Sequence, residues 1–285
     1  MTPSTDTVVP ASARAEIGVI GGSGFYKFLT DSERVSITTP FGDPSDDVLI
    51  GDVEGRRVAF LARHGQGHRF PPHRINYRAN LWALRSVGVR QVLAPCAVGS
   101  LKPEHGPGTI VVPDQVVDRT WGRDHTVYDG IGPVVHVGFS DPYCPRGRPV
   151  AINAVRAAGE NVVDTGTMVV INGPRFSSRA ESLWHQQAGW SVVGMTGMPE
   201  ASIARELAMC FTTIALVTDH DAGVEVGEAV THAEVLRVFA RSIDGVKAVL
   251  QSAVALMPAA EDDASATCLC RRSLDGLTLP ITLPT

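Results

Sequence analysis

The chain has 285 residues, with 25 basic and 30 acidic side chains, so its formal net charge at pH 7 is −5. Hydrophobic residues make up 44% and charged residues 19% of the chain, a balance that is typical of a globular protein and argues against disorder. The mildly acidic pI near 6.0 offers no basic surface for nucleic acid or for anionic membranes, so we expect neither partner.

The two ends of the chain differ in composition from the middle. Residues 1–14 are rich in Thr, Ser, Pro and Ala and predict a flexible N-terminal tail, and residues 258–266 predict a solvated linker at the start of a C-terminal tail, 258–285. Nothing similar interrupts residues 15–257, which predict one domain. The sequence shows neither a signal-peptide pattern nor about 18 consecutive apolar residues, so we expect a cytoplasmic protein.

The five cysteines are few and odd in number, which does not suggest the disulfide framework of a secreted protein. Cys268 and Cys270 are separated by one residue in the polar tail. They either close a small strained disulfide or bind nothing, and the second interpretation is favoured. We expect no metal site.

Short apolar runs alternate with amphipathic stretches along the chain. Val235, Phe239, Ile243, Val246 and Leu250 form the apolar stripe of a long last helix. Ile75, Ala79 and Trp82 mark another helix, and buried strands are predicted at 17–20, 58–62, 89–94, 109–113, 168–171, 191–193 and 211–218. The alternation predicts a single α/β domain with a mostly parallel or mixed central sheet, and with catalytic groups on loops at strand ends.

A glycine-rich run, Gly21-Gly22-Ser23-Gly24, follows the first predicted strand directly. It matches neither the dinucleotide-binding fingerprint, nor a P-loop, nor the Gly-x-Ser-x-Gly frame of a nucleophile elbow. Its backbone N–H groups and the Ser23 hydroxyl suit an anion, although a plain tight turn explains the run equally well.

Two further segments offer groups to an anion. Arg63 and His64 end a strand, and a guanidinium matches the geometry of phosphate oxygens. His64 and His68 have the spacing of a metal pair, but the glycines between them oppose the helix that such a pair needs. Thr196 lies close to Pro199, which suits a first helical turn, so Thr196 is expected near an anion-binding helix N-terminus.

Asp219 and Asp221 follow the most strand-like stretch of the chain. In an extended backbone they face the same side, and two close carboxylates do not ionise together easily. One of them would then have a raised pKa and could donate a proton. A metal site lacks a third ligand at supportive spacing, and a solvated acidic turn is the remaining alternative.

These segments and several others make the sequence similar to the trimeric purine nucleoside phosphorylases, above all to the 5′-methylthioadenosine phosphorylase branch. The resemblance runs from about residue 16 to 252. It is carried by Gly-Gly-Ser-Gly at 21–24, Thr-Pro-Phe-Gly-Asp-Pro-Ser at 39–45, Ala-Arg-His-Gly at 62–65, Asn-Tyr-Arg-Ala-Asn at 76–80, Gly-Thr-Met-Val-Val at 166–170, Gly-Pro-Arg-Phe-Ser-Ser-Arg-Ala-Glu at 173–181 and Gly-Met-Thr at 194–196. It implies one α/β domain with a mixed, partly barrel-like sheet, a homotrimer, and inorganic phosphate as co-substrate without a cofactor.

The resemblance also implies roles for single residues. Asp219 and Asp221 would contact the base and act in catalysis. Phosphate would be held by Ser23, Arg63, His64, the Cys96-Ala97 backbone and Thr196. The nucleoside would also contact Phe176, Met195, Val235 and His136, the last from a neighbouring subunit, and specificity would depend on Ser177 and His232.

The implied reaction is phosphorolysis of 5′-methylthioadenosine to adenine and 5-methylthioribose 1-phosphate. A protonated and an ionised Asp complement N7 and N6 of a 6-aminopurine, and relatives that act on 6-oxopurines carry Asn at the position of Asp219. At His232 and Gly194 the sequence differs from the methylthioadenosine branch and resembles enzymes that bind a 5′-hydroxyl. Adenosine or another 5′-substituted purine nucleoside is therefore an alternative substrate. A nucleoside-binding module without catalysis and a hydrolase are the other possibilities.

Overall fold

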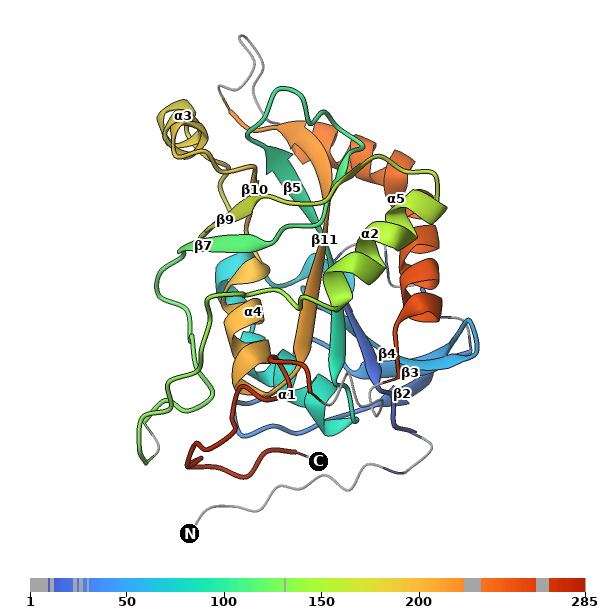
Figure 1. The fold of residues 1–285 in the computed structure, drawn as a ribbon, viewed down its shortest axis with the longest axis vertical. Coiled ribbons are helices and arrows are strands. Elements are labelled where there is room, and N and C mark those ends of the chain that lie inside the picture. Colours follow the sequence, from blue (N-terminus) through green and yellow to red (C-terminus); the bar gives the residue numbers. More distant parts are fainter. Residues whose placement is uncertain are drawn as a thin grey trace.

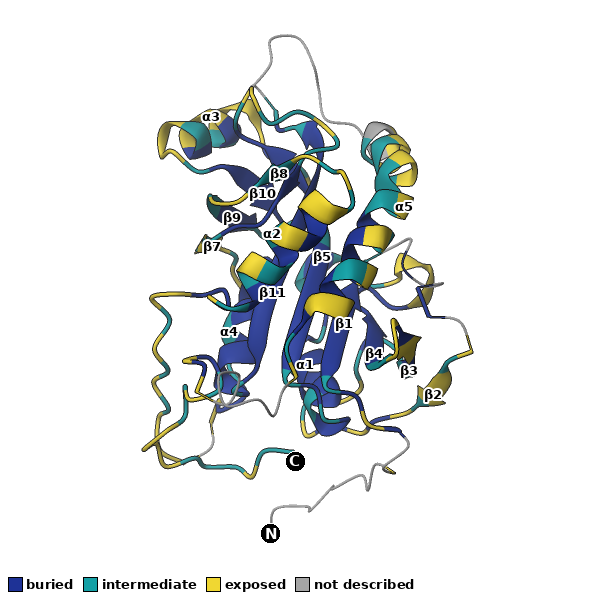
Figure 2. Cartoon of the chain, turned by 45° about the vertical axis from the view of Figure 1, so that its right-hand side comes forward, coloured by how far each residue is buried: buried dark blue, intermediate teal, exposed yellow. Residues whose placement is uncertain are grey.

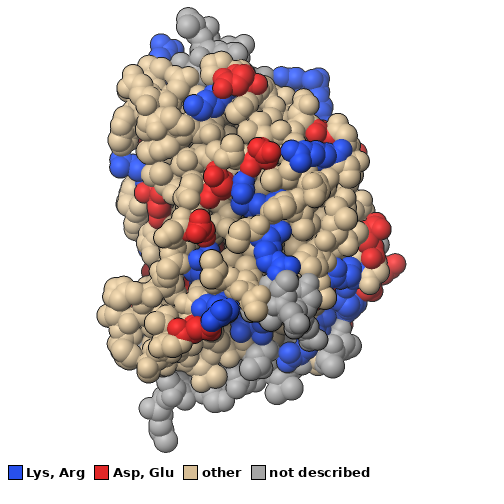
Figure 3. Space-filling model, viewed as in Figure 1, with Lys and Arg blue, Asp and Glu red and all other residues tan. Residues whose placement is uncertain are grey.

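The protein is described here from a computed structural model, which covers residues 10, 13–22, 25, 28–29, 31–130, 132–222, 232–259 and 267–284. For two residues of helix α5, His232 and Glu234, the backbone is described but the side chain is not. None of the helices among these residues is long and apolar enough to cross a membrane. On the face shown in Figure 3, basic and acidic side chains are interspersed among uncharged ones.

An eleven-stranded mixed sheet forms the centre of the described chain (Figure 1). Its main path runs in the order β2 (Glu33–Val35), β3 (Val48–Val53), β4 (Arg56–Ala62), β1 (Ile17–Gly21), β5 (Gln91–Ser100), β10 (Val192–Gly194), β9 (Thr167–Ile171) and β7 (Gln115–Arg119). A branch leaves β5 through β11 (Cys210–His220), β6 (Ile110–Val111) and β8 (Val162–Val163). Strand β5 therefore belongs to both parts of the sheet.

Helices cover both faces of this sheet (Figures 1 and 2). Helices α1 (Tyr77–Ser86) and α4 (Gly197–Glu206) pack on one face, and α2 (Gly147–Ala157) and α5 (His232–Leu256) on the other. Side chains of neighbouring strand residues lie on opposite faces of the sheet. In β1, Val19 packs in the core under α2 and α5, whereas Ile20 packs in the core under α1 and α4. Helix α3 (Arg179–Gln187) lies at the periphery, beyond β9 and β10.

The predicted fold class is confirmed: the structure is a mixed α/β domain flanked by helices. Strand β5 extends past the predicted end at residue 94, through Pro95 to Ser100. A proline fits there because β1 pairs with β5 only as far as Leu93. The strand predicted at 109–113 is shorter, covering only Ile110–Val111.

The C-terminal segment differs from the polar tail predicted by composition. Residues 267–284 lie against the domain, where Leu279, Ile281 and Leu283 pack on the core that α1 and α4 share with the sheet. Cys268 and Cys270 are buried, and both are free thiols. The small disulfide that was the less favoured interpretation of their spacing is therefore not formed.

Candidate active site

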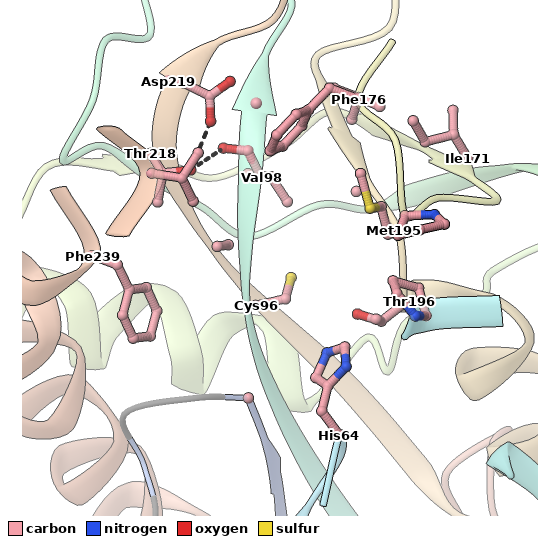
Figure 4. Close-up of a pocket in the computed structure, with 18 of the residues that line it drawn as sticks. His64, Cys96, Val98, Ile171, Phe176, Met195, Thr196, Thr218, Asp219 and Phe239 are labelled. Atoms are coloured by element: carbon pink, nitrogen blue, oxygen red, sulfur yellow. Dashed lines mark hydrogen bonds between the residues drawn. The ribbon is translucent and has the colours of Figure 1, made fainter. Parts of the chain in front are cut away.

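A cavity of about 380 Å³ opens where β5 and β11 end (Figure 4). Its lining combines a few polar groups with a largely apolar wall, which is typical of a small-molecule site. In Figure 4, His64 and Thr196 lie toward one end of the cavity, and Asp219 and Phe176 toward the other. Of the predicted site residues it brings together Arg63, His64, Cys96, Ala97, Phe176, Ser177, Met195, Thr196, Asp219, Asp221 and Val235.

Asp219 and Asp221 face the same side, as their spacing predicts. Both approach Gly99 of β5: a Cβ atom placed on Gly99 would lie 2.9 Å from Oδ1 of Asp219 and 3.3 Å from Cβ of Asp221. The Thr218 hydroxyl donates a hydrogen bond of 2.8 Å to Asp219, and the Ser182 hydroxyl of α3 donates to Asp221. The two carboxyl groups are thus held in fixed and different environments over a strand that has no side chain at that point.

Arg63 is buried in a network that the sequence did not suggest. Its Nε and Nη2 donate to the Glu200 carboxylate at 2.7 and 3.0 Å, and both side chains are almost fully buried. Nη1 and Nη2 also donate to the carbonyls of Pro95 and Ile20. Burial opposes the charge on Arg63, but the Glu200 carboxylate offsets this and leaves the pKa of the guanidinium raised. Glu200 therefore holds a permanent positive charge rigidly at the cavity.

His64 is buried as a neutral ring. Its Nδ1 lies 2.8 Å from the Phe70 carbonyl, which can only accept, so Nδ1 carries the proton and Nε2 is left as an acceptor. The ring stacks on His68 with centroids 4.0 Å apart. Burial lowers the pKa of His64 to about 3, although the Phe70 hydrogen bond opposes the shift. Nε2 can thus accept a hydrogen bond from a protonated oxyanion.

This environment predicts a loss of stability in mild acid. Below pH 6.5 the unfolded chain takes up a proton at His64 whereas the folded protein does not. Proton uptake therefore favours the unfolded state, and the free energy of unfolding falls as the pH drops from 6.5 toward 3. Between pH 7 and 5 the loss is about 2 kcal/mol, or roughly 4–8 °C in Tm. Thermal melts of the wild type and of His64→Gln in phosphate-free buffer measure this loss of stability. If Tm depends on pH in the same way in both proteins, His64 is not its cause.

Thr196 caps α4, but this helix begins irregularly. Met198 and Pro199 have non-helical dihedral angles, so the regular helix starts at Glu200. Pro199 lies in the first turn of α4, as predicted, but that turn is irregular, and Glu200 directly after it pairs with Arg63. Thr196 is nevertheless buried beside the cavity, and its side chain makes no capping hydrogen bond.

A second buried arginine, also missed from the sequence, fixes the neighbouring loops. Arg123 donates to the carbonyls of Met195 at 2.9 Å and Asn172 at 2.8 Å, and to the Tyr77 hydroxyl at 3.1 Å. These bonds connect the segment before α4 with the end of β9. Arg123 thereby positions Met195, which lines the cavity.

The remaining predicted residues fall into three groups. The Ser177 hydroxyl is buried in the lining and has no hydrogen-bond partner among the described residues. His136 is exposed and does not line the cavity of its own chain. Ser23 and the side chain of His232 lie outside the described residues. Burial raises the pKa of the Cys96 thiol to about 12, which keeps this lining group neutral.

Comparisons with known proteins show the family to which the chain belongs. A family model described as the phosphorylase superfamily matches residues 16–255. The chain is 59% identical to a purine nucleoside phosphorylase of Streptomyces coelicolor, over 95% of this chain and 98% of that one. It is 52% identical to an S-methyl-5′-thioadenosine phosphorylase of Mycolicibacterium smegmatis, over 94% and 99% of the two chains.

A solved structure has the same fold. Methylthioadenosine phosphorylase from Schistosoma mansoni in complex with adenine superimposes with a TM-score of 0.85 at 37% identity, covering 91% of this chain and 99% of that one. Sequence and fold thus agree over nearly the full length of these relatives. The chain belongs to the phosphorylase superfamily and is a pentosyltransferase of its nucleoside phosphorylase group.

Proposed function

We propose that the protein catalyses phosphorolysis of 5′-methylthioadenosine, giving adenine and 5-methylthioribose 1-phosphate. A phosphate oxygen forms a bond to the anomeric carbon while the bond from that carbon to N9 breaks. The electron pair of the broken bond leaves with the base, which takes a proton at N7. Phosphate supplies the nucleophile and a carboxyl group the proton, so the reaction as proposed needs no cofactor.

The two ends of the cavity suit the two halves of this reaction. The charge on Arg63 and the acceptor on His64 favour a monoprotonated phosphate at one end, with the Thr196 hydroxyl and the backbone of Cys96 and Ala97 nearby. At the other end, Asp219 and Asp221 complement the N7 and N6 edge of a 6-aminopurine, beside the Phe176 ring. Fixing the anion and relieving the charge on the leaving base both stabilise the transition state.

One observation favours a methylthio group at the 5′ position. Val235, Leu236 and Phe239 of α5 line the cavity together with Phe25, whose ring meets that of Phe239 edge to face at 6.0 Å, and they make this part of the wall apolar. Such a wall gains from burying a methylthio group and leaves a hydroxyl without a hydrogen-bond partner. The relatives named for methylthioadenosine support this assignment.

Purine nucleosides with a 5′-hydroxyl are the second candidate class. The Streptomyces coelicolor relative, named a purine nucleoside phosphorylase, supports this alternative, as does His232 at the beginning of α5. An imidazole facing the 5′ position would donate to a hydroxyl and gain little from a methylthio group.

His232→Val is expected to shift the preference between these substrates. If the imidazole contacts the 5′-substituent, the ratio of kcat/KM for methylthioadenosine to kcat/KM for adenosine rises in the variant. The expected rise is about 1–2 kcal/mol, roughly five- to thirtyfold. Adenosine, 5′-deoxyadenosine and 5′-methylthioadenosine are assayed on both proteins at saturating phosphate. Identical ratios in the two proteins would exclude His232 as a specificity residue.

The proposed reaction is tested by adenine release with and without phosphate. Phosphate-dependent release together with a pentose 1-phosphate product supports phosphorolysis. Release that is undiminished without phosphate indicates a hydrolase, and binding without release indicates a nucleoside-binding module. Either result contradicts the proposal.

We also propose a homotrimer in which His136 reaches the cavity of a neighbouring subunit. His136 is exposed, and its surroundings include the exposed Val134, with Trp121 at the end of β7 exposed as well. Large apolar side chains that remain exposed in one chain suit an interface between copies. Light scattering at the mass of a trimer supports this assembly, and a monomer mass contradicts it.

A further inference from the structure

Four of the five cysteines form a cluster far from the cavity. Cys144 lies just before α2, Cys210 begins β11, and Cys268 and Cys270 belong to the C-terminal segment. All four are buried, with at most 7% of any residue exposed. Segments separated by more than a hundred residues in the sequence thus converge on one point. In Figure 1 the red C-terminal segment passes the lower ends of α4 and β11.

The sulfur atoms have the arrangement of a tetrahedral metal site. Sγ of Cys268 lies 3.7 Å from that of Cys144 and 3.8 Å from that of Cys210, and the four Sγ atoms all lie within 4.8 Å of one another. Zinc–thiolate bonds of about 2.3 Å give a tetrahedron with S···S edges of about 3.8 Å. All four side chains are free thiols, so each offers one sulfur ligand at this place.

The surroundings suit thiolates rather than an ordinary apolar contact. The backbone N–H of Gly147 donates to Sγ of Cys144 at 3.3 Å, and Nη2 of Arg205 donates to Sγ of Cys270 at 3.7 Å. Arg205 is itself buried and held by the Gly138 carbonyl. Four thiolates around a divalent ion carry a net charge of −2, which a buried guanidinium offsets. Outer donors of this kind fix the ligands of protein metal sites.

We propose that Cys144, Cys210, Cys268 and Cys270 bind one structural Zn²⁺ ion. Binding replaces the four thiol protons, which are released to solvent, with four Zn–S bonds. Four protein ligands close the coordination sphere, so no position is open for substrate or water. The site lies about 30 Å along β11 from Asp219, because Asp219 is nine positions beyond Cys210 and extended chain rises about 3.3 Å per position. It therefore stabilises the fold and takes no part in phosphorolysis.

The consequence for the chain is a crosslink between its C-terminal segment and the domain. The linker at 258–266 is followed by Cys268, and beyond the cluster Ser273 donates to the Arg205 carbonyl at 2.7 Å. The ion would fasten residues 267–284 over the ends of α4 and β11. A segment that reads as a polar tail from its composition is thus docked in two ways, because the proposed metal ligands add to the apolar contacts of Leu279, Ile281 and Leu283.

Metal analysis of protein purified without a metal-affinity tag tests the assignment. We expect about one zinc per chain after dialysis against metal-free buffer. Cys268→Ser combined with Cys270→Ser is expected to remove it, whereas Cys96→Ser, the matched change at the fifth cysteine, is expected to retain it. Removing zinc from the wild type with a chelator is expected to lower Tm by about 5 °C or more, and adding zinc back to restore it.

Thiol counting on the wild type keeps the proposal testable even where a variant does not fold. Unfolded with chelator and without reductant, a zinc-bound protein exposes five free thiols. Three or one free thiols without zinc would mean disulfides and would overturn the proposal. Five free thiols without zinc, or iron in its place, would overturn it equally.

Discussion

Asp219→Asn is expected to lower kcat/KM for 6-aminopurine nucleosides by about 100-fold or more, the usual scale for losing a general acid. The amide retains the shape of the carboxyl group and can still accept from Thr218, but it cannot pass a proton to N7. Nucleosides of 6-oxopurines are expected to lose less activity or to gain some, because an amide can donate to a 6-carbonyl. Rates for 5′-methylthioadenosine, adenosine and inosine measure the effect.

Asp52→Asn serves as the control for this change. Asp52 is exposed on β3, where it faces Arg57 at 3.4 Å, and it does not line the cavity. Equal losses for both kinds of purine in Asp219→Asn would contradict its proposed role in choosing the base.

Arg63→Ala is expected to reduce both phosphate binding and stability. The apparent KM for phosphate should rise roughly tenfold to a hundredfold, because a charged donor contributes about 1.5–3 kcal/mol. The same change leaves Glu200 as a buried carboxylate without its partner, which costs about 3–5 kcal/mol of the free energy of unfolding. Phosphate titrations of the rate, together with denaturant unfolding, measure the two effects separately.

Glu200→Gln distinguishes the loss of the ion pair from the loss of the phosphate ligand. It retains Arg63 and the side-chain shape, so the expected result is lower stability with a smaller rise in the phosphate KM. If the two variants show the same phosphate dependence at temperatures where both are folded, Arg63 acts on the fold alone.

The strands that could be predicted are the ones buried on both sides. Residues 17–20 and 211–218 are mostly apolar runs in which every residue is buried, and they form β1 and most of β11. Strands β2 and β7 escape prediction because most of their residues are exposed or polar, so no apolar run marks them. Helix α3 has only two buried residues, Ser182 and His185, and therefore no apolar stripe.

The site shows a similar division. Residues adjacent to glycine-rich strand ends, such as Arg63 and His64, could be found because local chemistry marks them. Glu200 and Arg123 could not, since each acts through a partner at least 46 positions away along the chain. The sequence does contain Glu200 next to Pro199, but only the fold reveals that the turn there carries a carboxylate to Arg63.

The sharing of β5 between both branches of the sheet has a consequence for how substrate preference can change. Cys96 and Gly99 of this strand line the cavity toward the ends proposed for phosphate and for the base, and β1, β10 and β11 all pair with β5. The two ends therefore belong to one cooperative folding unit, and altering either disturbs the other. Helix α5 lies outside the sheet, and Val235, Leu236 and Phe239 are its described side chains that line the cavity. We therefore expect mutations at these positions to change the preferred 5′-substituent without altering the residues proposed to break the glycosidic bond.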